Sequence, residues 1–171
     1  MAKKSGPKHG LKNYQYPDKF GKMLGYKVTV ADKTNFRAET VLRVRVDHLS
    51  PAKRLHGGVV SAFFDYSMGA AVFTTLHALD FCSTVELKVN YLKPILLGDF
   101  LTSKTEVMFR GKRLCVVRGL IYRNDEPAPV AMASGTFNIV SGEEAAKRVQ
   151  KTGDGQKGAT GKPRTIKARS K

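Results

Sequence analysis

Apolar and polar residues alternate along much of the chain with a period of two, which is typical of strands with one buried face. Five runs show this alternation, the first two most clearly: 36–47, 83–91, 100–110, 113–123 and 129–140. A further strand is expected around Leu24 to Val30. The links between the later runs are short and rich in turn residues, so these strands are predicted to be antiparallel neighbours.

The stretch from Val59 to Ala78 differs because it is too long for a strand and apolar on nearly every side. This pattern predicts a helix that is buried all round. Two strands come before the helix and four follow it without another helix, so a single sheet must wrap it. The expected fold class is α+β, with an antiparallel β-sheet wrapped around a long central α-helix.

The charge is concentrated at the two ends of the chain. Of 171 residues with a net charge of +16, residues 1–12 hold four lysines and no acid, and residues 141–171 hold nine basic and three acidic residues. The end of the chain is also rich in Gly and Thr and poor in apolar residues. We therefore expect a flexible basic segment over 1–20, one domain over 21–141, and a disordered basic tail over 142–171.

Several classes of protein do not fit this composition. No run of about 18 apolar residues is present, and the basic N-terminus is not followed by an apolar stretch, so neither a membrane span nor a secretion signal is expected. Cys82 and Cys115 form no disulfide framework. The four histidines lack the spacing of metal ligands, so no metal site is expected. A cytoplasmic protein fits best.

Asp65 is the one carboxylate between Arg54 and Asp80, and it stands in the middle of the apolar helix. It lies too far inside the helix to cap its N-terminus, and no basic residue stands three or four positions away. One interpretation is a structural Asp hydrogen-bonded to a strand. The other is a general base or nucleophile in a water-poor cleft.

His56-Gly57-Gly58 opens the same helix. Without side chains, the two glycines let a ligand approach backbone N–H groups that point along the helix dipole, where a carbonyl oxygen gaining charge is stabilised. A tight turn is the simpler reading. Gly58 and Asp65 are seven residues apart, or roughly 10 Å along one helix. Two subunits with antiparallel helices would bring Gly58 of one chain to Asp65 of the other, so the spacing favours a dimer.

Two segments resemble the hotdog-fold acyl-CoA thioesterases, in particular the phenylacetate-degradation type. They read HGGVVSAFFDYSMGAAV and STVELKVNYLKPILLGDFLTSKTEVMFRGKRLCVV, within a resemblance that covers roughly Leu24 to Val140. It implies that Gly58 supplies the oxyanion-binding N–H beside His56 and that Asp65 activates water or attacks the thioester. It also implies that Thr84 holds the water.

The resemblance fails in the loop before the helix. There Ser50 stands where the family usually has an Asn on the acyl side, and Lys53 stands where it usually has Gly. Both departures concern the loop on the acyl side, so they bear on the rate and the substrate choice.

Weaker candidates concern substrate binding. Arg110, Lys112 and Arg113 form a basic turn suited to the phosphates of coenzyme A, or else a solvated hairpin tip. Gly57 and Phe64 are candidates for the acyl side, although large rings on a helix more often form core.

The function expected from these residues is hydrolysis of acyl-CoA thioesters to free acid and coenzyme A, by a homodimer or homotetramer. No cofactor is expected, because coenzyme A is part of the substrate. One alternative is a non-catalytic acyl-CoA-binding protein. The other, suggested by the charge, is a nucleic-acid-associated protein, although weak polyanion contact through the tail is the most that we expect.

Overall fold

A computed structural model describes residues 18–77 and 80–142 of the chain. The described residues form one antiparallel sheet of six strands in the order β1-β2-β4-β5-β6-β3. The strands are β1 (Lys27–Asp32), β2 (Arg37–Arg43), β3 (Phe81–Tyr91), β4 (Phe100–Arg110), β5 (Leu114–Arg123) and β6 (Ala131–Val140). The helices are α1 (Lys19–Leu24), the 3-10 turn η1 (Val46–His48) and α2 (Gly57–Phe73).

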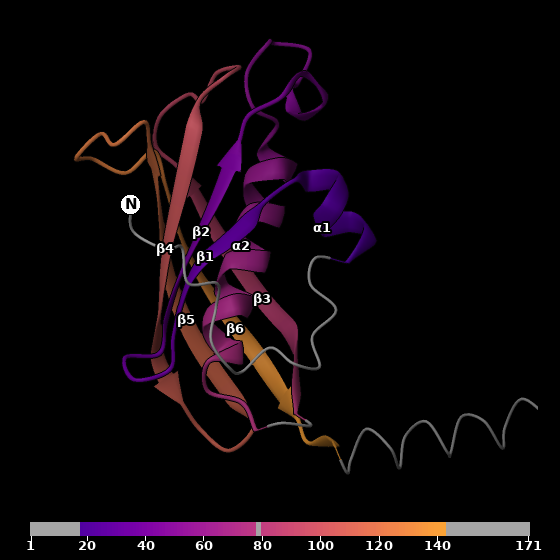
Figure 1. Ribbon diagram of the computed structural model, residues 1–171, viewed down its shortest axis with the longest axis vertical. Coiled ribbons are helices and arrows are strands. Elements are labelled where there is room, and N and C mark those ends of the chain that lie inside the picture. Colours follow the sequence, from indigo (N-terminus) through magenta and orange to yellow (C-terminus); the bar gives the residue numbers. More distant parts are fainter. Residues whose placement is uncertain (1–17, 78–79, 143–171) are drawn as a thin grey trace, which may run out of the picture.

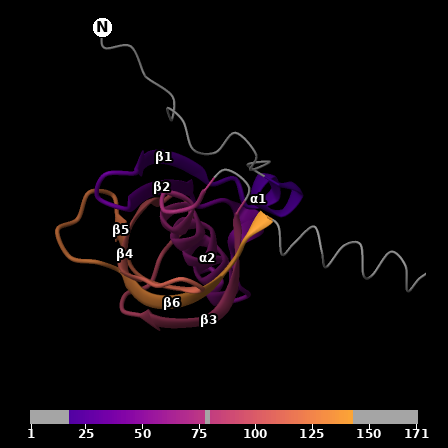
Figure 2. The same cartoon turned by 90° about the horizontal axis from the view of Figure 1, so that it is seen from below.

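The strands curve around α2, which runs along the inner face of the sheet (Figures 1 and 2). α2 contacts every strand of the sheet. The predicted antiparallel α+β class is therefore confirmed, and each predicted strand is present. The first of the five runs is shorter than expected, because β2 ends at Arg43 and η1 takes up the end of that run.

α2 begins two residues before the predicted helix and ends five residues before its predicted end. It begins early because the His56 side chain accepts a hydrogen bond from the Gly58 N–H and caps the helix. It ends early because the chain leaves the helix at Thr74 and Thr75, whose hydroxyls donate to the carbonyls of the last helical turn. Threonine favours such bonds over continued helix.

The prediction that the helix is buried all round is wrong for the single chain, because α2 has two unlike faces. The face toward the sheet is buried and carries Val60, Phe63, Phe64, Ser67, Met68, Ala71 and Val72. The other face, which includes Ser61, Asp65 and Gly69, is half-buried. This half-buried face of small and polar side chains is the one that remains open to a partner or a ligand.

Two glycines in the sheet allow α2 to lie close to it. A Cβ on Gly119 of β5 would lie 3.1 Å from the Phe64 ring and 3.0 Å from Met68, and one on Gly135 of β6 would lie 2.9 Å from the Met68 sulfur. Phe64 is fully buried at this contact. In this chain the Phe64 ring therefore packs in the core, as large rings on a helix more often do.

α1 was not predicted, and it contains the expected domain boundary at residue 21. Asp18 caps α1 by accepting the Gly21 N–H at 2.6 Å, and the same carboxylate accepts the Tyr66 hydroxyl of α2 at 2.7 Å. The Tyr66 ring also packs on Tyr26, with centroids 4.4 Å apart. Residues 18–20 therefore belong to the folded domain. The basic tail expected over 142–171 lies outside the described residues, apart from Gly142.

Candidate active site

Asp65 and Thr84 meet on the open side of α2. The Thr84 hydroxyl, on β3, donates to Asp65 Oδ1 at 2.6 Å. Asp65 is half-buried and Thr84 is exposed. Within the described part of the chain, no lysine, arginine or histidine forms an ion pair with Asp65. One oxygen of the carboxylate is thus oriented by a hydrogen bond.

Cys82 lies on β3, two residues before Thr84, and is close enough to Asp65 to be affected by its charge. Burial, and after it the negative charge of Asp65, raises the pKa of the Cys82 thiol to about 12. A thiol with such a pKa stays protonated at neutral pH and is a poor nucleophile. Asp65 is therefore the better candidate for attack or proton transfer at this place.

The predicted oxyanion donor, Gly58, is already hydrogen-bonded. Its N–H donates to His56 Nδ1 at 2.9 Å, the bond that caps α2. Among the described residues, no acceptor is found for the N–H of Gly57, the first residue of the helix. The structure therefore points to Gly57, rather than Gly58, as the N–H available to a ligand, and gives His56 the role of a cap. The sequence did not distinguish the two glycines because both belong to the same motif.

A pocket of about 380 Å³ opens beside Gly57. Its walls are mostly apolar and include Leu55, Val60, Leu92, Pro94, Ile95 and Val130, with Arg54 and Lys93 also lining it. Tyr91 of β3 forms one side of this Gly57 pocket, and its hydroxyl lies 2.9 Å from the Ser61 hydroxyl and 3.3 Å from the Gly57 carbonyl. Tyr91 was not singled out from the sequence, where it is one aromatic residue at the end of a strand.

Ser50 does not line the Gly57 pocket. Its hydroxyl donates to the Arg54 carbonyl at 3.0 Å, inside the loop before α2. Lys53 in the same loop has a positive φ of 56°, a conformation that glycine adopts without strain. Lys53 adopts this conformation at some cost in free energy.

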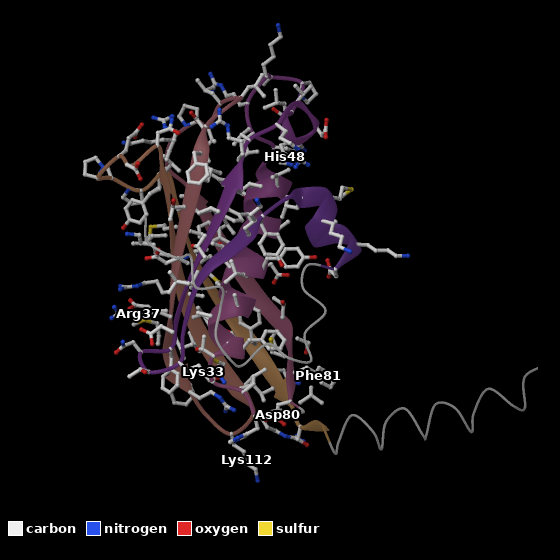
Figure 3. All side chains as sticks on the ribbon, viewed as in Figure 1. Lys33, Arg37, His48, Asp80, Phe81 and Lys112 are labelled. Atoms are coloured by element: carbon white, nitrogen blue, oxygen red, sulfur yellow. The ribbon has the colours of Figure 1, made fainter. Side chains whose placement is uncertain are left out.

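Arg110, Lys112 and Arg113 lie together at the other end of α2. They line a second pocket of about 350 Å³ with His77, Asp80, Ile139 and Ser141. Arg110 is held there by a hydrogen bond from its Nε to the Thr75 hydroxyl at 3.1 Å. Figure 3 shows Lys112 and Asp80 at the opposite end of the molecule from His48. Within one chain, this basic pocket is therefore far from Gly57.

No cluster of potential metal ligands occurs among residues 18–77 and 80–142. In the same part of the chain, no helix is long and apolar enough to cross a membrane.

Comparison with known proteins shows what this chain is similar to. Residues 52–129 match the model of the thioesterase superfamily. Two proteins of Saccharolobus solfataricus, each named "Putative esterase", are also similar. One is 46% identical over 63 residues, which cover 37% of this chain and 41% of that protein. The other is 28% identical over 134 residues, which cover 78% of this chain and 92% of that protein. The match thus spans less than half the length of the first relative.

Solved structures show the same fold. A "putative thioesterase, phenylacetic acid degradation-related protein" of Ralstonia eutropha has 25% identity and a TM-score of 0.65, with 70% of this chain and 88% of that chain covered. A hypothetical thioesterase of Streptococcus pneumoniae, solved with coenzyme A, has 23% identity and a TM-score of 0.61, with 68% and 89% covered. Residues 52–129 thus resemble the thioesterase superfamily, and the chain shares its fold with the phenylacetic acid degradation-related protein of Ralstonia eutropha.

Proposed function

We propose that this protein hydrolyses acyl-CoA thioesters to a free acid and coenzyme A. The observation that carries the proposal is the Asp65 carboxylate, which Thr84 holds by a hydrogen bond of 2.6 Å on the open face of α2. A carboxylate oriented through one oxygen can accept a proton from water, or attack a carbonyl carbon, with the other. The coenzyme A bound to the hypothetical thioesterase of Streptococcus pneumoniae supports this choice of substrate.

The complete site needs two subunits. Gly57 and Asp65 are eight residues apart, or roughly 12 Å along the axis of α2, which is too far for both to act on one carbonyl group. Two copies with antiparallel α2 helices would place Gly57 of one copy beside Asp65 of the other. Each dimer would then contain two equivalent sites.

The edge strand β3 supports this assembly. It is the last strand of the sheet, with β6 as its neighbour on one side, and it is 11 residues long and largely exposed. Its exposed side chains include Phe81, Val85 and Tyr91, which are 41%, 60% and 56% exposed. A long, exposed edge strand has unpaired backbone groups that favour pairing with another strand. Pairing of two β3 strands would join the sheets and bring the half-buried faces of α2 together.

In the proposed reaction, the thioester carbonyl oxygen accepts the Gly57 N–H at the positive end of α2. Asp65 of the other subunit either takes a proton from an attacking water or adds to the carbonyl carbon, which gives an anhydride that water then cleaves. In both routes the carbon–sulfur bond breaks and coenzyme A leaves as a thiolate that regains a proton. Thr84 keeps one oxygen of Asp65 occupied, so that the other faces the substrate.

A non-catalytic acyl-CoA binder is the second candidate. Ser50 favours it, because the hydroxyl at the position of the family's Asn is bonded to the Arg54 carbonyl and does not line the Gly57 pocket.

Release of thiol from a panel of aryl, short-chain and long-chain acyl-CoA thioesters, followed with a disulfide reagent, decides between the two. We expect turnover that Asp65→Asn abolishes. Binding of acyl-CoA without turnover would establish the binder, and a fully active monomer in light scattering would refute the two-subunit site.

A further inference from the structure

We propose that one end of the molecule binds an anionic lipid surface. The site is an exposed apolar patch, here called the tip patch, which consists of Phe36, Met108, Phe109 and Leu114, with lysine and arginine side chains around it. The tip patch includes no residue of the Gly57 pocket or of the Asp65 site. The inference therefore goes beyond the proposed function and is tested separately from it.

The tip patch lies at the end of the sheet where β1 turns into β2 and β4 turns into β5 (Figure 1). In chain order, its four side chains are 42%, 56%, 58% and 45% exposed. The Val107 N–H donates to the Phe36 carbonyl at 3.0 Å, and the Gly111 N–H donates to the Leu114 carbonyl at 2.8 Å. The Phe109 ring packs on Gly111, where a Cβ would lie 3.0 Å from it. Large apolar side chains thus gather on one exposed surface, which is typical of an interaction site.

The strand register turns two of these side chains away from the core. Phe109 of β4 is paired with Val116 of β5, which alternates with the buried Cys115 and so lies on the outer face of the sheet. Met108 is the extra residue of a β-bulge, because the register shifts between Val107 and Phe109. Strict alternation would turn either Met108 or Phe109 inward. With the bulge, both are exposed.

Phe36 stands at a turn position that suits glycine or asparagine better. Its φ is 53°, which is unusual for a bulky residue and costs free energy. Its ring is exposed, so packing within this chain does not offset that cost. A partner that buries the ring would offset it, because an aromatic side chain gains free energy on leaving water.

Cations around the tip patch favour an anionic partner. Lys33 lies in the turn between β1 and β2, and Lys112 and Arg113 lie in the turn between β4 and β5; all three are exposed. Figure 3 shows Lys33 and Lys112 toward the end of the molecule opposite His48. β6 also ends there, and residues 141–171 hold nine basic and three acidic residues. Lysine and arginine near an anionic bilayer add to the affinity for it.

The rest of the outer face argues for lipid and against a second copy of this chain. Beyond the tip patch, Glu106 of β4 forms ion pairs with Arg37 and Arg118, and Lys104 lies over the Tyr122 ring. Burying such charges in a dry contact between two sheets would cost free energy. A small apolar tip flanked by cations instead suits the boundary between the headgroups and the acyl chains of an anionic bilayer.

Vesicle binding by the full-length protein tests the proposal. The protein is sedimented with vesicles of phosphatidylcholine alone, and with vesicles of equimolar phosphatidylcholine and phosphatidylglycerol. We expect binding to the anionic vesicles only, and weaker binding at high salt because salt screens the charges. Met108→Gln with Phe109→Gln should weaken this binding about tenfold or more, because two large apolar side chains no longer leave water. Phe36→Asn should weaken it too without loss of thermal stability, since asparagine adopts a positive φ readily.

The matched control is Leu96→Gln with Leu97→Gln. These leucines are 48% and 53% exposed in the link before β4, at the other end of the molecule. This control has the same loss of exposed apolar surface and the same charges, so it should bind the anionic vesicles as the wild type does.

Three results would overturn the inference. The first is a wild-type protein that does not bind the anionic vesicles. The second is wild-type binding strength in the Met108→Gln, Phe109→Gln variant and in Phe36→Asn, which would show that charge alone attaches the protein. The third is a larger wild-type assembly in light scattering that the Met108→Gln, Phe109→Gln variant splits, because the tip patch would then contact another copy of the chain.

Discussion

Replacing Gly57 with proline would remove one hydrogen-bond donor and little else. Proline lacks the backbone N–H, and Gly57 is the first residue of α2, a position where proline is favoured because that N–H has no partner in the helix. His56 has the extended ψ of 135° that suits the residue before proline. A Cβ at position 57 would meet the Tyr91 ring at 3.5 Å, an ordinary contact.

The expected effect is large on activity and small on stability. Loss of one oxyanion donor costs a factor of about 10² to 10³ in kcat, or about 3–4 kcal/mol of transition-state stabilisation. Stability should hold or rise by about 0.4–1 kcal/mol, because proline restricts the unfolded chain. The assay is thiol release from the best acyl-CoA substrate, together with thermal unfolding.

Gly58→Ala is the matched control for this prediction. It keeps every N–H in the motif, and its Cβ would lie 3.1 Å from the capping nitrogen of His56, so a modest change in activity is expected. If Gly57→Pro folds and keeps a kcat near that of the wild type while Gly58→Ala loses activity, the Gly58 N–H is the donor and our assignment is wrong.

Three further changes test other parts of the reasoning. Asp65→Asn should lower kcat by a factor of about 10² or more, with unchanged thermal unfolding and acyl-CoA affinity, whereas Thr84→Ala should keep part of the rate. An Asp65→Asn variant with nearly normal turnover would show that Asp65 is structural. Lys53→Gly should raise the free energy of unfolding, measured by denaturant titration, by about 1 kcal/mol, because glycine adopts a positive φ without strain. A lower free energy of unfolding would show that the lysine side chain stabilises the loop. Iodoacetamide at pH 8 should label Cys82 far more slowly in the folded than in the unfolded protein, because a pKa of about 12 keeps the thiol of the folded protein protonated. The labelling rate of the folded protein should rise with pH, and equal labelling rates of the folded and unfolded protein at pH 8 would contradict this.

The sequence predicts the strands well because each has a repeating pattern. β4 runs over Phe100–Arg110, with the bounds that the alternation indicates. The short helix α1 has only six residues, too few for a helical period to emerge, so it was missed. Its position depends on contacts between distant parts of the chain, such as the bond between Tyr66 and Asp18.

The candidate site could be predicted from the sequence only in part, because its details also depend on contacts in the folded chain. The resemblance singles out both Asp65 and Thr84, but it gives Thr84 the role of holding the water and does not predict the hydrogen bond between the two side chains. Which of Gly57 and Gly58 has the available N–H could not be predicted, because it depends on which N–H the His56 side chain accepts. For Phe64 the sequence left both a core position and an acyl contact open, because an apolar helix does not reveal which of its sides faces the sheet.

The glycines at positions 119 and 135 set how close α2 lies to β5 and β6, since a methyl group at either would press on Met68. α2 carries Asp65 on its opposite side, and Thr84 belongs to a strand whose place is fixed by β6. A helix pushed outward by one such methyl group would separate the carboxylate from its threonine while the rest of the fold persists. A mutational screen scored on turnover alone would therefore mark Gly119 and Gly135 as sensitive positions, although neither touches the substrate. A parallel screen scored on the amount of folded protein would show that substitutions there are better tolerated.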